Sequence, residues 1–458
     1  MRRNKAIFII LILLFGSIQL KAQMNAAKED LVIPLSIEQA VDLGLSQNRT
    51  IKATELSTLK SQYATKEIQA DRYPQVNATT SYVRNIKPTV FYFPKVGISP
   101  TGELAVNNNE MMSVNASSKN HFNGIIDLHL PLFNPELNEG IKLSKLNTEL
   151  SKANREVAKW ELADEIRKAY YNVLLAELNK ELVERAISRA EQTLNDTRVL
   201  YKNGVVLVSD TLNVYINVQG QKSNLFMVDN QIIQAMNYLK DLMGISLASE
   251  LILIDAIDED YLSGQILAGQ SIPSFSDRPD IRQNISHQSL AKKQIDLDKS
   301  RRLPSLDFIS QYQIQAQSDN FKFRQYDWPQ SFFVGIQLNI PIFNGFKHDR
   351  RAKQSFIALQ ELKIAEEQLA SRALLEYKNA DGDFMASFSK IRINKDIVQA
   401  AEKSLELVNE RYKKGIGRYQ DVLDGQFNLI QANNAYNKAV YDAYIALAAK
   451  KKALGIIR

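Results

Sequence analysis

The titratable side chains of this sequence are not arranged for catalysis or metal binding. Its four histidines, at positions 121, 129, 287 and 348, lack metal-ligand spacing, and no nucleophile-elbow, P-loop or dinucleotide-binding glycine motif occurs. The absence of cysteine rules out disulfides and thiolate metal sites. We therefore expect no enzyme and no cofactor. Asp421 and Asp424 are three residues apart and share one helical face, where they are either an electrostatic device or ordinary solvated and dipole-facing helix acids.

The N-terminus predicts export. Arg2, Arg3 and Lys5 precede an apolar run over 6–15 and a small-residue exit near 22–23, which together are typical of a signal peptide over residues 1–23. Its removal takes away four cationic side chains and lowers the formal charge from +6 to +2, so we expect no nucleic-acid partner. No later segment offers 18 uninterrupted apolar residues, so we also expect no membrane-spanning helix.

A duplicated unit organises the rest of the chain. Residues 126–134 align with 336–344 at an offset of 210, and Gly204 and Gly244 align with Gly415 and Gly455 at an offset of 211. Upstream, residues 71–76 align with 301–306 at an offset of 230. We predict two repeats, 24–244 and 276–458, separated by an equatorial segment over 245–275.

Four segments alternate between apolar and polar residues with the period of a β-strand: 75–84, 123–133, 304–316 and 331–343. Ile126 and Leu128, for example, share one face, opposite Asp127 and His129. The segments are 10–13 residues long, enough for a tilted transmembrane strand of about 9–11 residues, although a half-buried soluble sheet alternates in the same way. Four strands cannot close a barrel, and open edges are not tolerated in lipid. The chain must therefore oligomerise, with three copies giving twelve strands, or stay out of the membrane.

Long helices connect these strands. The pattern predicts long helices over 135–203 and 345–414, and return helices over 208–243 and 420–455. Shorter helices over 50–71 and 279–302 would stack end to end with the return helices. A helix of about 70 residues is about 105 Å long. Apolar residues at heptad spacing predict side-by-side packing, which a coiled-coil spacer without a channel would share; in the first repeat they are Ile187, Ala190, Leu194, Thr197 and Tyr201.

Three segments carry a resemblance to a known family. Residues 411–424, RYKKGIGRYQDVLD, resemble the helix–turn–helix tip of TolC-family outer membrane efflux proteins. Residues 341–345 and 35–40 are similar to the family's strand-to-helix junction and N-terminal segment, and the likeness covers residues 35–456. The resemblance implies a mainly α-helical homotrimer, in which four strands per chain build a 12-stranded outer-membrane β-barrel that continues into a periplasmic coiled-coil tunnel.

The same resemblance implies a function and partners. Family members are exit ducts of tripartite efflux or secretion systems. They contact a periplasmic adaptor (a membrane fusion protein), an inner-membrane transporter of the RND, ABC or a similar class, and outer membrane lipid. Most of the chain would then lie in the periplasm of a Gram-negative cell. A non-pore periplasmic adaptor or spacer is the alternative, and the four bilayer-length strands favour the duct.

The resemblance also assigns roles to individual residues. Asp421 and Asp424 match aspartates that surround the periplasmic entrance, where six carboxylates from three copies would favour cations. Tyr412 matches a tyrosine that helps hold the tip closed, although its heptad position also fits a packing residue. Asp210 is the first-repeat counterpart of Asp421. The sequence departs from the family where some members carry a gate arginine, because that position is Gly417 and Arg418 is next to it. The implied adaptor-contacting tips are Lys202, Asn203, Gly204, Val205, Lys413, Lys414, Gly415 and Gly417.

Overall fold

The computed structural model describes residues 33–87, 89–98, 102, 104–115, 117–255, 259–266 and 274–457. The signal peptide predicted over 1–23 lies outside these residues. Two compact units are present. Unit 1 comprises Met1–Ser57, Lys152–Ile285 and Ala365–Arg458, and unit 2 comprises Thr58–Ser151 and Ser286–Ile364. None of the described helices is both long enough and apolar enough to cross a membrane.

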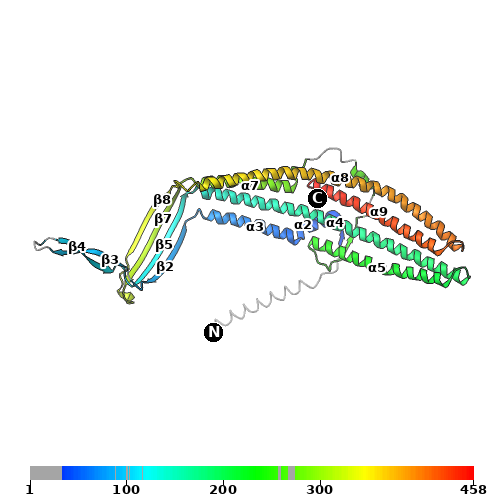
Figure 1. Ribbon diagram of the computed structural model, residues 1–458, viewed down its shortest axis with the longest axis horizontal. Helices are drawn as coiled ribbons and strands as arrows, with labels where there is room; N and C mark the ends of the chain where they lie inside the picture. The colour runs from blue at the N-terminus through cyan, green and yellow to red at the C-terminus, as the bar shows by residue number, and fades with distance from the viewer. Residues whose placement is uncertain are drawn as a thin grey trace, which may run out of the picture. The chain divides into compact units, whose positions relative to one another are not determined.

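Unit 2 contains an antiparallel four-stranded sheet with the strand order β2-β5-β7-β8 (Figure 1). The strands are β2 Gln75–Arg84, β5 Asn120–Phe133, β7 Ser305–Ser318 and β8 Gln330–Asn339. The register aligns apolar residues across all four strands, as in the row Ala78, Ile126, Tyr312 and Phe332. Polar residues occupy the opposite face. There, Asn77 donates to Asp127 (3.2 Å) and Gln313 to Asn123 (2.9 Å); these lie in β2, β5 and β7.

The two repeats differ where a strand meets proline. We expected strands to extend to 133 and 343, and β5 does reach Phe133, with a register shift between Pro131 and Phe133. The second-repeat strand, β8, ends earlier, at Asn339. Pro341 has no N–H to donate to a ladder, so an edge strand readily ends before it. Residues 340–346 form an irregular link in which Phe346 has a positive φ of 63°.

The segment that joins β2 to β5 contains regular structure that the sequence analysis did not predict. Val90–Ile98 (β3) and Leu104–Asn115 (β4) pair antiparallel as a separate two-stranded sheet. The shorter β7–β8 connection contains the 3-10 turn η1, Phe323–Gln325. Its aromatic rings gather around Phe122 of β5, whose ring centroid lies 5.2 Å from that of Phe323 and 4.7 Å from that of Tyr82.

Helices make up most of the remaining chain (Figure 1). They are α2 Ile37–Gln47, α3 Arg49–Ala70, α4 Pro135–Lys202, α5 Val208–Met243, α6 Glu259–Ile266, α7 Pro279–Ser300, α8 Lys347–Lys413 and α9 Tyr419–Ala453. In the equatorial segment, β6 Leu251–Leu253 pairs in parallel with β1 Ile33–Leu35. Asp255 accepts a hydrogen bond from the Ile37 N–H (2.7 Å), which fixes this segment to the start of α2.

The core of unit 1 forms where α2, α4, α5, α8 and α9 pack together. Ile166, Tyr170, Leu239, Phe384 and Val440 are among its most buried members. Gly44 allows α2 to approach α4, because a Cβ at this position would lie 2.2 Å from Ile166 Cδ1. Small and branched residues therefore allow the long helices to lie close together.

The predicted heptad packing of α4 is present within one chain for its central members and not for its last member. Ala190, Leu194 and Thr197 are buried, but Tyr201 is 47% exposed. Its second-repeat counterpart, Tyr412, is only 2% exposed. These two tyrosines, which correspond by the offset of 211, therefore differ in their surroundings within one chain.

Candidate functional site

The two helix–turn–helix tips have the same backbone geometry. Gly204 and Gly415 adopt φ values of 71° and 74°, in the left-handed region that glycine tolerates best. In each tip the glycine N–H bonds the carbonyl three residues earlier (2.9 Å), and the next N–H bonds the carbonyl five residues earlier. This is the Schellman arrangement, which satisfies the last carbonyls of α4 and α8.

Acids at the start of the return helices act as caps. Asp210 Oδ2 accepts the Leu207 N–H (3.0 Å), and Asp421 Oδ2 accepts the Arg418 N–H (3.3 Å). A carboxylate at this position also interacts favourably with the positive end of the helix dipole. Asp424, one turn later, is exposed and accepts a hydrogen bond from Gln420 Nε2 (3.0 Å). The two predicted entrance acids therefore have different local roles.

Tyr412 links the second tip to α4. Its hydroxyl lies 2.8 Å from Thr197 Oγ1, and its ring packs in a cluster with Leu200 and Val422. Burial raises the pKa of Tyr412, because it disfavours the ionised phenolate. At neutral pH this residue is a neutral, hydrogen-bonded connection between the two helical hairpins.

The predicted tip residues also meet at the turns. A Cβ on Gly415 would lie 2.9 Å from Val205 Cγ1, so the two tips touch at this point. Lys413 forms an ion pair with Asp196 of α4, with an Nζ–Oδ2 distance of 3.3 Å. Arg418 is exposed, as are the other predicted contact residues Lys202, Asn203, Gly204 and Lys414.

A buried set of hydrogen bonds, which the sequence did not predict, joins α9 to α4 and α5 further along the helices from the tips. Gln426 of α9 is buried, its Nε2 donates to Thr193 Oγ1 (3.1 Å), and its Oε1 accepts from Asn217 Nδ2 (3.4 Å). Beside it, Asp424 and Arg189 line a cavity of about 310 Å³. Polar side chains at a helical seam fix register, and a polar residue at a heptad position would have been its signal in the sequence.

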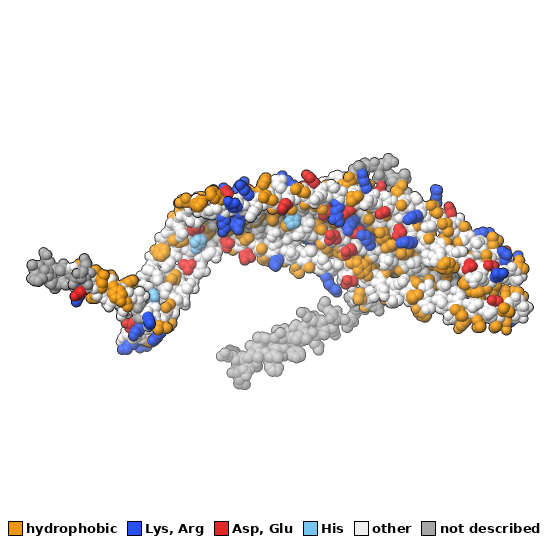
Figure 2. All heavy atoms as spheres, in the orientation of Figure 1, with side chains coloured by type: hydrophobic (Ala, Val, Ile, Leu, Met, Phe, Trp, Pro, Cys, Tyr) orange, Lys and Arg blue, Asp and Glu red, His pale blue; other side chains and the backbone are white. Residues whose placement is uncertain are grey.

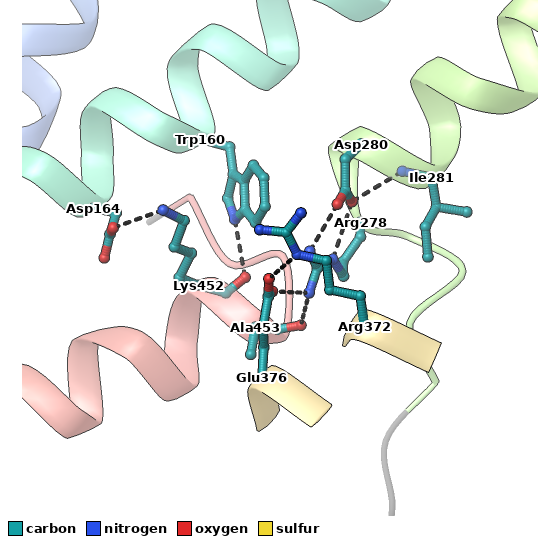
Figure 3. Close-up of polar contacts among 9 residues, drawn as sticks. All are labelled: Trp160, Asp164, Arg278, Asp280, Ile281, Arg372, Glu376, Lys452 and Ala453. Carbon is teal, nitrogen blue, oxygen red and sulfur yellow. Dashed lines mark hydrogen bonds and ion pairs between the residues drawn. The ribbon is translucent and has the colours of Figure 1, made fainter. Parts of the chain in front are cut away.

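A second cluster missed by the sequence analysis joins α4, α7, α8 and α9 (Figure 3). Arg278, 2% exposed, donates to Asp280 (2.7 Å) and Glu376 (2.9 Å). Its guanidinium lies over the ring of Trp160, 5.1 Å from the centroid, and Lys452 lies 5.5 Å from the same centroid. Burial would lower the pKa of Arg278, but the two acidic partners outweigh it and raise the pKa.

Arg278 and Asn48 make equivalent contacts in the two halves of the chain. Arg278 Nη1 donates to the carbonyl of Ala453 at the end of α9 (3.2 Å), and Asn48 Nδ2 donates to that of Leu242 at the end of α5 (2.7 Å). Residues 48 and 278 are related by the upstream offset of 230, and 242 and 453 by the downstream offset of 211. Each short helix is thus fastened to the end of its return helix by one side chain.

These tips offer neither a nucleophile paired with a base nor a ligand set for a cofactor. Within the described residues, no group of three or more His, Asp or Glu side chains could hold a metal ion. What the tips provide is charge, a hydrogen bond between the two hairpins and exposed surface.

Comparison with known proteins assigns the chain to a family. The sequence profile of the family described as outer membrane efflux protein matches residues 40–245 and 275–456. The chain belongs to the outer membrane efflux protein family. Membership confirms the resemblance in the sequence and identifies the chain as an efflux channel component rather than an enzyme.

Relatives of this efflux protein match over most of its length. The probable efflux pump outer membrane protein TtgC of Pseudomonas putida is 23% identical over 408 residues, covering 87% of this chain and 78% of the relative. Outer membrane protein TolC of Vibrio cholerae is 22% identical, covering 64% of this chain and 67% of the relative. A crystal structure of CusC matches with a TM-score of 0.70 at 17% identity and 93% coverage of both chains, which shows a shared fold.

Proposed function

We propose that this efflux protein is the exit duct of a tripartite efflux or secretion system in the outer membrane. Three copies would close their sheets into a 12-stranded barrel, and their helices would form the periplasmic tunnel. A periplasmic adaptor would contact the tips, and an inner-membrane transporter of the RND, ABC or a similar class would supply the substrate.

The four-stranded sheet is the observation that carries this proposal. Its edge strands β2 and β8 have unpaired edges, and one of its faces is apolar across all four strands. Lipid can cover such a face but cannot satisfy the hydrogen-bonding groups of an open edge. Pairing of β8 from one copy with β2 of the next would remove every edge. Three copies of four strands give twelve, an even number within the range of outer-membrane barrels.

The helical hairpins support the same assembly through the repeat. In the first repeat, α4 and α5 form a groove that receives α9 of the same chain, with Gln426 bonded to Thr193 and Asn217. The equivalent groove on α8 and α9 has a volume of about 540 Å³ and is lined by Ala400, Ser404 and Asn428, among others.

By the offset of 211, Ser404 and Asn428 correspond to Thr193 and Asn217, and Tyr215 corresponds to Gln426. We therefore assign this groove to α5 of a neighbouring copy. Tyr215 and Ile216 of α5 are exposed in the single chain, and such a contact would cover them. Six similar hairpin contacts would then surround the axis, three within chains and three between them.

The predicted entrance residues fit this arrangement. Asp421 and Asp424 lie in the first turn and a half of α9, directly after the tip, so three copies would place six carboxylates near the end of the tunnel. Tyr412 joins neighbouring hairpins, and its hydroxyl contact would be released if the tip opened.

Single-channel recording of the purified mature protein in planar bilayers tests the proposal. We expect insertion as a trimer and small cation-selective conductance steps. Recovery from cells as a soluble monomer after osmotic release, without detergent, would contradict the duct and favour a non-pore periplasmic adaptor or spacer.

A further inference from the structure

Within the described residues, the β3–β4 hairpin of unit 2 forms a sheet separate from the four-stranded one. Its two strands pair with each other, while β2 and β5, which it connects, pair with each other in the four-stranded sheet. An isolated two-stranded hairpin is marginally stable in water at best, because it has no second layer against which to bury its side chains. The hairpin therefore needs a cover from outside the chain.

Exposed apolar side chains lie on both faces of the hairpin. Opposite residues of an antiparallel pair share a face, so the register places Phe91, Phe93, Met112 and Val114 together. The other face has Tyr92 and Met111, with Ser113 opposite Tyr92. Each of the six apolar side chains is at least 40% exposed, and Figure 2 shows apolar side chains gathered on the described part of the hairpin. Two exposed apolar faces predict two partners rather than one.

We propose that the two faces pack against the same hairpins of two neighbouring copies, which forms a ring at the outer end of the duct. The inference rests on the proposed trimer. In a cyclic trimer each copy has two neighbours, and a head-to-tail contact brings one face of each hairpin against the opposite face of the next. A two-faced apolar hairpin matches this symmetry, whereas a single docking partner would need only one face.

The connections of the hairpin place it beside the subunit boundary. It follows β2, which is an edge strand of the four-stranded sheet and would pair with β8 of the next copy. It also leaves β2 at Arg84, the strand end opposite to the one that α3 enters. With the helices in the periplasm, the hairpin therefore emerges on the exterior, next to a neighbouring chain.

The charges on the hairpin favour a protein partner over lipid. Lys95 and Glu110 form an ion pair across the two strands, with Nζ and Oε2 3.0 Å apart and both side chains more than half exposed. Lipid would have to take up this pair along with the apolar faces, and burying charges in hydrocarbon is costly. In a ring of hairpins the pair can stay in water at the rim while the aromatic faces are covered.

Cysteine cross-linking tests the ring directly, because the chain has no native cysteine. The double variant Phe93→Cys, Met111→Cys places one thiol on each face. The two thiols point to opposite sides and cannot bridge within one hairpin. Under mild oxidation of whole cells we expect covalent dimers and trimers from the double variant. The matched control is Lys322→Cys, Asp327→Cys, which places two exposed thiols on the β7–β8 connection and should remain uncoupled.

The outcomes separate the ring from the duct. A variant that migrates as a trimer without boiling, but shows no covalent species while both thiols react with a maleimide, would overturn the ring and leave the duct intact. Quenching of a fluorophore at position 93 by lipid-attached spin labels would overturn it in favour of a membrane-lying hairpin. The absence of any trimer in the unmodified protein would remove both proposals.

Discussion

At the residue scale, Asp421 and Asp424 of α9 make different contacts. Asp421 caps the helix through the Arg418 N–H, whereas Asp424 is exposed and accepts a hydrogen bond from Gln420 of its own helix. The sequence predicted a pair with a shared face and left open whether the acids were electrostatic or dipole-facing. The structure shows that the Asp421 carboxylate caps the start of α9, a contact that depends on where the helix begins and that spacing alone cannot give.

The two acids should therefore respond differently to substitution. Asp424→Asn is expected to lower cation selectivity in bilayer recordings with no change in thermal stability, since no backbone group depends on it. Asp421→Asn should keep a capping oxygen, lose only the interaction of its charge with the helix dipole, and act mainly on selectivity. Asp421→Ala should also lose the cap, at a cost of about 1 kcal/mol of tip stability. Asp210→Ala is the matched control for the lost cap. Unchanged selectivity in both asparagine variants would mean that these carboxylates do not face the lumen.

Tyr412 predicts a pH dependence of tip closure. Its pKa is raised by burial, so the neutral phenol favours the closed contact with Thr197. For a group whose folded pKa exceeds its unfolded value of about 10, the stabilisation is complete below that pH and is lost as pH rises through the folded pKa. We expect channel open probability to be constant from pH 7 to 9 and to increase above about 10.

Tyr412→Phe separates this effect from the titration of lysines. The variant lacks the hydroxyl contact, a loss of about 1 kcal/mol, so it should open more often at neutral pH. It should also lose the part of the alkaline increase that comes from the phenol. An alkaline response identical in both proteins would assign that response to other groups.

At the element scale, the helices were predictable and one hairpin was not. Proline-free stretches with heptad spacing predicted long helices close to those seen in α4 and α8, because helix geometry depends on local sequence. Residues 90–98 carry apolar side chains on both faces and include Pro94 and Gly97, so they lack the alternation that identifies a half-buried strand. A strand that other chains cover on both faces would also lack this alternation, because both of its faces would be apolar.

The fastening of the short helices predicts an asymmetry between repeats. Arg278→Ala removes a buried guanidinium from two acids and from the Ala453 carbonyl. We expect the free energy of unfolding to fall by about 3 kcal/mol, the lower end of the range for a broken buried ion pair. The lower end applies because Glu376 keeps Arg372 as a partner. Asn48→Ala should cost about 1–2 kcal/mol, because it removes one cap and one carbonyl contact. Thermal unfolding of the detergent-solubilised protein, with hydrogen exchange at the ends of α9 and α5, measures both. Equal losses would mean that the charged partners of Arg278 add nothing.

At the scale of the whole molecule, the duplication predicts contacts that one chain cannot display. Groups that are buried in one repeat and exposed in the other, such as Tyr412 and Tyr201, are expected when each chain supplies only half of the equivalent interfaces. A repeat could be proposed from the sequence. The difference in burial could not, because it depends on which interfaces lie within the chain.

The groove on α8 and α9 gives the sharpest test of that assembly. Ser404 corresponds to Thr193, whose hydroxyl lies 3.1 Å from Gln426. In the equivalent contact between copies, Ser404 would face Tyr215 of a neighbouring α5 at a similar distance. A larger side chain at position 404 would then have no space. Ser404→Trp should preserve the helical content of the monomer, because Ser404 is exposed, and abolish the trimer on unboiled gels. Adding Tyr215→Ala should restore part of it, since the truncated residue is the expected neighbour.

Glu402→Trp is the matched control, because Glu402 is exposed two residues away and its counterpart Glu191 forms a surface ion pair with Lys222 (2.7 Å). This variant should assemble and conduct as the unmodified protein does. If Ser404→Trp also assembled normally, α5 could not occupy the groove, and the six hairpin contacts would not be equivalent. Closure of the barrel by its strand edges would then stand on its own, because it depends on hydrogen bonds that the helices do not supply.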